Sequence, residues 1–259
     1  MRYTTDLTDL EWRLIEYCFP KPSKTGRPRE HTYRQLLNAV FYVVRTACQW
    51  RNLPKDFAPW PTVYHYFRLW KHTKLWEQIH AHLREHLRQV EGRKRHATAG
   101  IIDSQSVRST ECSDQRGYDA GKKINGRKRH VLVDTLGLVL LVLVLPANIQ
   151  DRDAARQLLG KFFGQKSRRG LKHIWADGGY AGTFVAWALK LWRCTVEIVK
   201  RTDAHTFRVL PRRWVVERTF GWLGRCRRLN RDYERLAQTG ESVVYLAMIR
   251  IMLVRLAKS

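Results

Sequence analysis

The stretch from residue 97 to residue 200 alternates short apolar, β-branched runs with amphipathic helical segments, and this order restricts the possible folds more than any other feature. Three runs predict strands, with a turn at 134–137 between the last two: residues 99–106, 128–134 and 138–145. A helix, a strand, a helix and a strand are then predicted at residues 151–163, 172–177, 182–192 and 195–200. Three antiparallel strands followed by alternating helices and strands predict an α/β fold, with a mixed five-stranded sheet flanked by helices.

Three acidic residues fall on separate elements of this predicted core. Asp103 lies on the first strand, Asp177 at the end of the fourth, and Glu217 on an arginine-rich helix predicted over residues 211–229. The carboxylate of Glu217 can form a salt bridge with Arg213, one turn away, or it can bind a metal ion together with the two aspartates. The metal interpretation requires the first and fourth strands to be neighbours in the sheet.

The first 90 residues predict a small all-α domain. Helices are expected at residues 8–18, 32–47, 62–71 and 74–90, and the first two begin with capping boxes. The helix 62–71 is short, aromatic and basic, and it follows a helix and a turn, as in helix-turn-helix modules. His65 and Arg68 on this helix are candidate DNA contacts, while its aromatic residues can equally form a small core. Residues 91–97 are expected to be a basic linker and 98–259 a second domain, which ends in an apolar helix over 242–257.

The charge of the chain points to a polyanionic partner. The 48 Lys and Arg residues outnumber 23 Asp and Glu residues, which leaves a formal net charge of +25 spread along the whole length. An excess of this size favours nucleic acid as the partner. Five cysteines without a Cys-x-x-Cys pair indicate reduced thiols. Because the longest apolar run, residues 136–146, is too short to cross a bilayer, we expect a soluble, cytoplasmic protein without a membrane partner.

Several motifs, in the same order and over nearly the whole chain, resemble the DDE transposases of bacterial insertion sequences, of the insertion-sequence-five family. They include Ile102-Asp-Ser-Gln-Ser-Val107, Ala176-Asp-Gly-Gly-Tyr180 and Val216-Glu-Arg-Thr-Phe220, with further matches at residues 26–31, 37–54, 117–123, 126–130 and 147–153. The resemblance implies an RNase H-like catalytic domain behind a helix-turn-helix-like DNA-binding domain. It also implies that Asp103, Asp177 and Glu217 are the catalytic acids and hold two Mg²⁺ ions, for which Mn²⁺ can substitute.

The resemblance implies a function as well. Such a protein binds the terminal inverted repeats of its element as a synaptic homodimer, cuts the DNA with a metal-activated water, and joins the freed 3′-hydroxyl to target DNA. It would therefore be associated with the bacterial nucleoid. Three acids without a Ser-His or Cys-His pair suit a two-metal displacement at phosphorus and not a covalent protein nucleophile. Two alternatives stay open: a DNA-binding repressor derived from a transposase, and a metal-dependent nuclease without strand transfer.

The predicted helix 211–229 departs from the family at two positions. Arg213 matches the arginine that precedes the catalytic glutamate, but a family tyrosine is replaced by Leu210 and a family basic residue by Gly224. On a continuous helix Arg228, eleven residues after Glu217, would return to within about 20° of the face of Glu217, whereas Arg225 would lie about 80° away from that face. We therefore expect Arg228 to supply the missing phosphate contact.

A basic loop is expected between the first two strands of the second domain, over residues 108–129. Its positive side chains would follow the DNA backbone, although a surface loop with incidental charge is the alternative. The candidate contacts in this loop are Lys122, Lys123, Arg127, Lys128 and Arg129.

Overall fold

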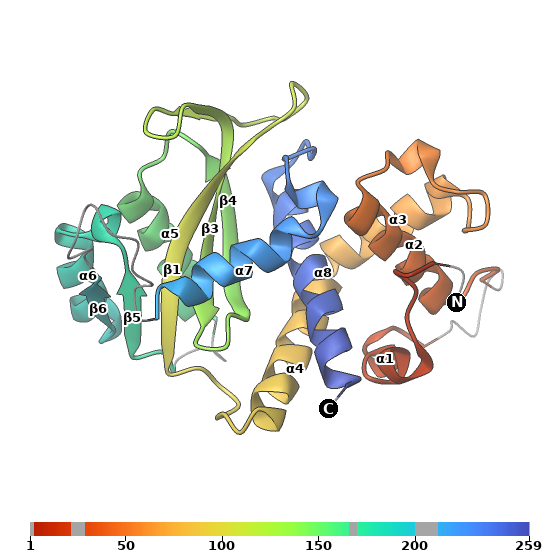
Figure 1. The fold of residues 1–259 in the computed structure, drawn as a ribbon, viewed down its shortest axis with the longest axis horizontal. Helices are drawn as coiled ribbons and strands as arrows, with labels where there is room; N and C mark the ends of the chain where they lie inside the picture. Colours follow the sequence, from red (N-terminus) through yellow and green to blue (C-terminus); the bar gives the residue numbers. More distant parts are fainter. Residues whose placement is uncertain (1–2, 22–28, 166–169, 200–211, 259) are drawn as a thin grey trace. The chain divides into compact units, whose positions relative to one another are not determined.

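The computed structural model describes residues 3–21, 29–165, 170–199 and 212–258 (Figure 1). Two compact units make up the chain. The first comprises Met1–Glu91, Arg225–Asn230 and Ser242–Ser259, and the second comprises Gly92–Gly224 and Arg231–Glu241. The division after Glu91 lies next to the expected linker, but two C-terminal segments that the sequence places with residues 98–259 pack in the first unit instead.

The first unit is helical. Its elements before the linker are α1 (Asp9–Arg13), η1 (Glu16–Cys18), α2 (Tyr33–Thr46), η2 (Trp50–Asn52), α3 (Trp60–His72) and α4 (Leu75–Val90). Both predicted capping boxes are confirmed, because the side chains of Thr8 and Thr32 each accept a backbone N–H at the third helical position. The helix predicted from Thr62 begins earlier, at Trp60, where Pro61 suits the first turn.

The sequence of α3 allowed two interpretations, a small aromatic core and a DNA-contacting helix, and the helix has a side that suits each. Phe67 and Trp70 are almost wholly buried in the first unit, where Trp70 meets Trp76 edge to face with 5.2 Å between ring centroids. His65 and Arg68, on the other side of the same helix, are exposed. The inward side of α3 therefore forms an aromatic core, and the outward side is available to a partner.

The C-terminal helix α8 (Ala237–Leu256) joins the first unit through most of its length. The ring of Tyr245 lies 4.9 Å from that of buried His80 on α4. Arg250 pairs with buried Glu11. Because α8 is apolar on several sides, it must be covered on more than one face, and this requirement explains its place with the N-terminal helices.

A mixed sheet forms the core of the second unit and confirms the predicted fold class. The strands are β1 (Ala99–Arg108), β2 (Gly117–Asp119), β3 (Ile124–Asp134), β4 (Val139–Pro146), β5 (His173–Ala176) and β6 (Thr195–Ile198). Their order is β2-β3-β1-β5-β6, and β4 also pairs with β3. The pairs β1–β3 and β3–β4 are antiparallel, whereas β1–β5 and β5–β6 are parallel. The sheet has six strands instead of five because part of the expected basic loop forms β2.

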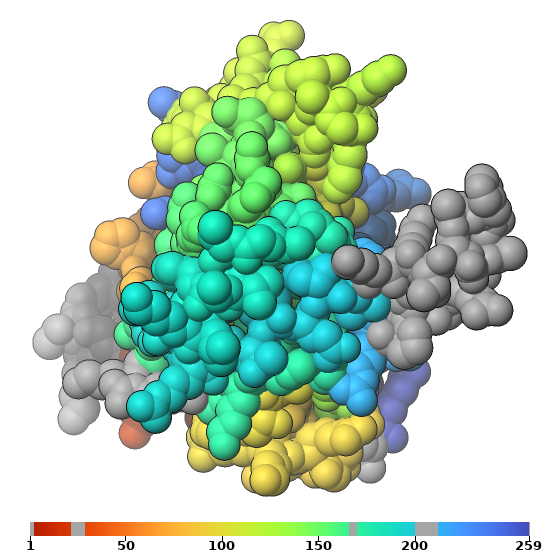
Figure 2. All heavy atoms as spheres, turned by 90° about the vertical axis from the view of Figure 1, so that its left-hand side faces the viewer, coloured from red at the N-terminus to blue at the C-terminus, as the bar shows by residue number. Residues whose placement is uncertain are grey.

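Helices cover both faces of this sheet. Helices α5 (Asp151–Phe163) and α6 (Thr183–Trp192) pack on the face of Ile102 and Leu132 around a hydrophobic core. Figure 2 shows α5 and α6 as a green and teal layer over the sheet. Helix α7 (Trp214–Gly224) runs across the opposite face (Figure 1). Because side chains alternate along a strand, Asp103 points to the face opposite that of Ile102, which is the face of α7.

The turn between β3 and β4 has the predicted position. The amide of Gly137 donates to the carbonyl of Asp134 at 2.9 Å, and Gly137 has a φ of +83°, which favours glycine. The Asp134 carboxylate accepts the amides of Leu136 and Leu138 at 2.9 Å each. None of the helices in the described ranges is long and apolar enough to cross a membrane.

Candidate active site

The pairing of β1 with β5 brings two of the three predicted acids together. Ile101 lies opposite Trp175 in the parallel register, and Asp103 and Asp177 each follow this pair by two residues. The required neighbourhood of the first and fourth predicted strands is therefore confirmed. Asp177 directly follows β5, and Asp103 lies in the middle of β1, two residues beyond the last one paired with β5. Both carboxylates therefore lie beside the carboxyl end of β5, where α/β sheets commonly form their sites.

Arg213 lies between these carboxylates. Its Nη2 atom is 3.6 Å from Asp103 Oδ2 and 3.8 Å from Asp177 Oδ2. The side chains of Arg213 and Asp103 are 14% and 15% exposed, so solvent screens this contact less than a surface ion pair. One guanidinium thus balances part of the charge of two aspartates. Its position shows that the pair has the charge and the spacing to accept a cation.

The environment of Asp103 shifts its ionisation. Burial raises the pKa of Asp103 to about 6, and the negative charge of Asp177 adds to the increase. The amide of Ser104, which donates to Asp103 Oδ1 at 2.7 Å, and the charge of Arg213 act in the opposite direction. A partly buried carboxylate with a raised pKa beside a second carboxylate is typical of a functional site.

The third predicted acid is not joined to this pair. Glu217 lies in the first turn of α7 and is exposed, whereas Val215, Val216 and Thr219 face the core. Across the described ranges no group of three His, Cys, Asp or Glu side chains is arranged to hold a metal ion. Arg213, one turn before Glu217, faces the aspartates instead. Glu217 as the third ligand therefore stays a prediction.

Helix α7 is fixed to the turn between β3 and β4. The Thr219 hydroxyl donates to the Gly137 carbonyl at 2.8 Å, and Arg218 Nη2 donates to the Leu136 carbonyl at 3.0 Å. The Arg218 guanidinium also lies between two indole rings, 4.3 Å from the centroid of Trp214 and 4.6 Å from that of Trp222. These contacts set the place of α7, and with it the place of Arg213 and Glu217, on the sheet.

A second polar cluster occupies the opposite face of β1, next to the acid pair. Asp151, at the start of α5, accepts from the hydroxyl of Ser104 at 2.9 Å and from Lys128 Nζ at 3.2 Å. His130 is fully buried beside it, with Nδ1 3.9 Å from Asp151 Oδ1. None of these positions except Lys128 was a candidate from the sequence. The sequence feature that could have identified them is that all three lie in motifs that resemble the family, at residues 102–107, 126–130 and 147–153.

Three of the expected DNA contacts lie inside the second unit. Arg127, Lys128 and Arg129 belong to β3, and their side chains are nearly inaccessible. Arg127 forms an ion pair with buried Asp232 at 3.2 Å and donates to three backbone carbonyls, those of Gln115, Glu234 and Arg235. Burial lowers the pKa of Arg129 to about 10. The expected loop position of these residues is wrong, because β3 begins at Ile124. A run of basic residues in the sequence does not by itself distinguish an exposed loop from a buried strand.

The other expected contacts in this region are exposed. Lys122 and Lys123 lie on the connection between β2 and β3, which projects at the top of Figures 1 and 2. Lys122 Nζ also donates to the carbonyl of Ser104, the residue after Asp103, at 3.4 Å. Together with His65 and Arg68 on α3, these lysines remain predicted DNA contacts.

The expected arginine face beyond Gly224 does not exist. Helix α7 ends at Gly224, and Arg228 belongs to a separate turn, η5 (Arg227–Leu229), in the first unit. Arg228 is buried, donates to the Cys48 carbonyl at 3.3 Å and lies over the ring of Trp50. Arg225 is exposed, and its carbonyl accepts from Arg45. The helix-face argument is therefore wrong, because a glycine ends the helix. Leu210 and the predicted helix start at 211 lie outside the described residues.

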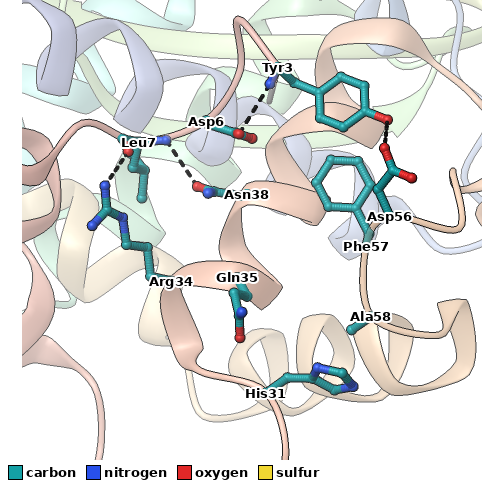
Figure 3. A pocket seen from close by; sticks show the side chains of 10 residues that line it. All are labelled: Tyr3, Asp6, Leu7, His31, Arg34, Gln35, Asn38, Asp56, Phe57 and Ala58. Carbon is teal, nitrogen blue, oxygen red and sulfur yellow. Dashed lines mark hydrogen bonds between the residues drawn. The ribbon is translucent and has the colours of Figure 1, made fainter. Parts of the chain in front are cut away.

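A pocket of about 520 Å³ lies in the first unit (Figure 3). Tyr3 and Phe57 stack along one wall, with 4.8 Å between ring centroids. The Tyr3 hydroxyl donates to Asp56 at 3.0 Å, and the Leu7 amide donates to the Asn38 side chain at 3.0 Å. These hydrogen bonds tie the start of the chain to α2 and to the segment before α3.

Comparisons with known proteins identify the family of the chain. A model of the family "Transposase DDE domain" matches residues 94–252, more than half of the chain, and a model described as "Putative transposase of IS4/5 family" matches residues 7–80. A curated relative, "Putative transposase for insertion sequence element IS402" of Burkholderia cepacia, is 33% identical over 120 residues, which are 43% of this chain and 56% of the relative. The chain thus matches little more than half of that relative's length.

A solved structure, that of the Mos1 strand transfer complex, is similar at 13% identity with a TM-score of 0.23, over 91% of this chain and 79% of that one. The DDE domain implies a need for divalent metal in general. With its two neighbouring aspartates, its mixed sheet and the match over residues 94–252, the chain belongs to the DDE transposases of insertion sequences.

Proposed function

We propose that this chain is an active DNA transposase, which binds the terminal inverted repeats of its element, cuts the DNA and joins the 3′-hydroxyl end to a target. One observation carries the proposal. Asp103 and Asp177 share a cation, the guanidinium of Arg213, just beyond the paired residues of β1 and β5. Such a carboxylate pair, in a domain of this family, favours phosphoryl transfer assisted by divalent metal.

Mg²⁺ is the expected cofactor, with Mn²⁺ as a substitute. Carboxylate oxygens are the ligands that both ions prefer. Asp103 and Asp177 would hold the metal, and Glu217 would complete the set from α7. When bound, two such ions activate the attacking oxygen and stabilise the leaving oxygen of a phosphodiester.

Positively charged residues near the aspartates would bind and orient the DNA for this reaction. Arg213, displaced from the aspartates, would be free to contact a phosphate next to them. Lys122, which donates to the carbonyl of Ser104, offers a second positive group near Asp103. His65 and Arg68 would contribute to the recognition of the inverted repeats. A synaptic homodimer, which holds two element ends together, is the expected assembly.

Incubation of the purified full chain with Mg²⁺ and DNA that carries the ends of its own element tests the proposal. We expect nicks at the element ends, followed by products in which the 3′ ends are joined to target DNA. Cleavage without joined products would show a nuclease. Specific binding without cleavage, in Mg²⁺ and in Mn²⁺, would show a DNA-binding repressor.

A further inference from the structure

The carboxylate of Asp151 has two oxygens with different surroundings. Oδ1 accepts the Ser104 hydroxyl at 2.9 Å and Lys128 Nζ at 3.2 Å. Ser104 in turn donates its amide to Asp103 Oδ1 at 2.7 Å. Through Oδ1, Asp151 is therefore fixed to β1 and β3 directly behind Asp103.

The other oxygen of Asp151 approaches the loop that carries Asp177. A Cβ atom placed on Gly179 would lie 3.6 Å from Asp151 Oδ2 and 3.1 Å from Asp177 Oδ1. The two carboxylates thus border the same small space, which is open because residue 179 has no side chain. Gly179 also donates its amide to Asp177 Oδ1 at 2.8 Å.

Two buried polar side chains, those of Tyr180 and His130, lie near Asp151. The buried Tyr180 hydroxyl makes no hydrogen bond of regular geometry in the described ranges; the Ser104 side chain is its nearest polar neighbour, and the negative charges of Asp103, Asp151 and Asp177 act on it. Burial raises the pKa of this phenol well above its usual value, so it remains a donor. Both ring nitrogens of His130 are likewise unsatisfied in the structure. Buried polar groups of this kind commonly mark bound water or an ion.

The charges around Asp151 leave it able to attract a cation. Lys128, whose side chain is 9% exposed, lies between Asp151 at 3.2 Å and Asp119 at 3.7 Å. One ammonium therefore serves two carboxylates. Burial lowers the pKa of His130 to about 4, so its ring carries no positive charge at neutral pH. The Asp151 carboxylate is thus only partly compensated.

We propose that Asp151 is a further acidic residue of the active site, a positioning residue that strengthens the binding of a divalent cation to Asp103 and Asp177 through water held at Oδ2. This inference rests on the proposed function. It assigns a role to a fourth acid, in addition to the three that the family resemblance implies. A purely structural ion pair with Lys128 is the competing explanation.

Two matched pairs of variants test the proposal through Mn²⁺ affinity, measured by electron paramagnetic resonance on the full chain without DNA. Asp151→Asn should weaken Mn²⁺ binding about tenfold, as is usual when a group beyond the direct ligands is lost. Asp153→Asn removes the same charge two residues away, from a 53% exposed side chain, and should change the affinity less than about twofold.

The second pair of variants leaves the charge of the chain unchanged. Gly179→Ala places a methyl group between the two carboxylates and should also weaken Mn²⁺ binding, whereas Gly178→Ala meets no atom within 4 Å and should not. This pair decides the question if Asp151→Asn fails to fold.

Melting temperatures measured without metal separate a loss of metal binding from a loss of fold stability. Unchanged Mn²⁺ affinity in Asp151→Asn, or in Gly179→Ala, would overturn the inference even if the melting temperature falls. If the unmodified chain binds no Mn²⁺, the proposed metal-dependent function itself is contradicted.

Discussion

At the scale of single residues, the place of Arg213 dominates the site. Its guanidinium contacts both aspartates that should hold metal, at 3.6 and 3.8 Å. The same carboxylate oxygens cannot serve a guanidinium and a metal ion at full strength. Metal binding must therefore compete with Arg213 in the structure described.

This competition predicts that Arg213→Gln binds Mn²⁺ more tightly than the unmodified chain. Loss of two partly buried ion-pair contacts, worth about 1 kcal/mol together, corresponds to an increase in affinity of about fivefold. Arg212→Gln is the control, because Arg212 stacks over the Trp175 ring at 4.3 Å and has the same charge. Equal affinities in both variants, measured by calorimetric titration, would show that Arg213 does not compete with metal.

Asp103 predicts a dependence of stability on pH. Because burial raises its pKa from 3.8 to about 6, folding disfavours the charged form. The penalty is absent below about pH 4, where both states are protonated, grows between pH 4 and 6, and is complete above pH 6, at up to about 3 kcal/mol. Asp103→Asn should therefore be more stable than the unmodified metal-free chain at pH 8 and equally stable near pH 4. Urea unfolding at the two pH values measures this, and a lower stability of the variant at pH 8 would contradict the raised pKa.

At the scale of elements, α7 depends on the turn at Gly137. A Cβ atom there would lie 2.8 Å from the Thr219 hydroxyl that fixes α7, and the backbone has a φ of +83°. We expect Gly137→Ala to lower the free energy of unfolding by about 1–3 kcal/mol. Gly160→Ala in α5, where a Cβ meets nothing within 4 Å, should instead stabilise the chain by about 0.5–1 kcal/mol. Thermal unfolding compares the two, and no loss for Gly137→Ala would show that the turn does not hold α7.

Elements whose signals are local could be predicted from the sequence. A capping box located the start of α2, and apolar runs located β1 and β5. That β1 and β5 are neighbours was a requirement of the metal interpretation, and the structure supplies it. The end of α7 was missed although Gly224 is a typical helix terminator. The burial of Arg127–Arg129 and the role of Asp151 could not be predicted, because they depend on partners distant in sequence, such as Asp232 and Ser104.

At the scale of the whole molecule, α8 packs in the same unit as the N-terminal helices. The recognition of the element's DNA ends therefore cannot be tested by deletion of the N-terminal residues alone. Deletion of the first 90 residues would remove the partners of Tyr245 and Arg250 and expose an apolar helix. Surface variants of α3 avoid this problem, because His65 and Arg68 are exposed.

We therefore expect the double variant His65→Ala, Arg68→Ala to lose preference for the element ends while it keeps salt-sensitive binding to unrelated DNA. Each lost base contact should cost about 1–3 kcal/mol of discrimination, and phosphate contacts elsewhere should remain. The double variant His82→Ala, Arg13→Ala, on other elements of the first unit, is the control. Competition gel shifts with both DNAs measure the preference, and an unchanged preference would remove α3 from end recognition.

The central claim is that three acids perform metal-dependent cleavage, although α7 presents Glu217 to solvent in the structure described. Cleavage of element-end DNA in Mg²⁺ by Asp103→Asn, Asp177→Asn and Glu217→Gln, with binding measured in parallel by gel shift, tests it most directly. We predict that each variant binds the ends as well as the unmodified chain, or more tightly because a charge facing phosphate is lost, and that none cuts them. Retained cleavage in any one of the three would remove that residue from the active site and contradict the claim.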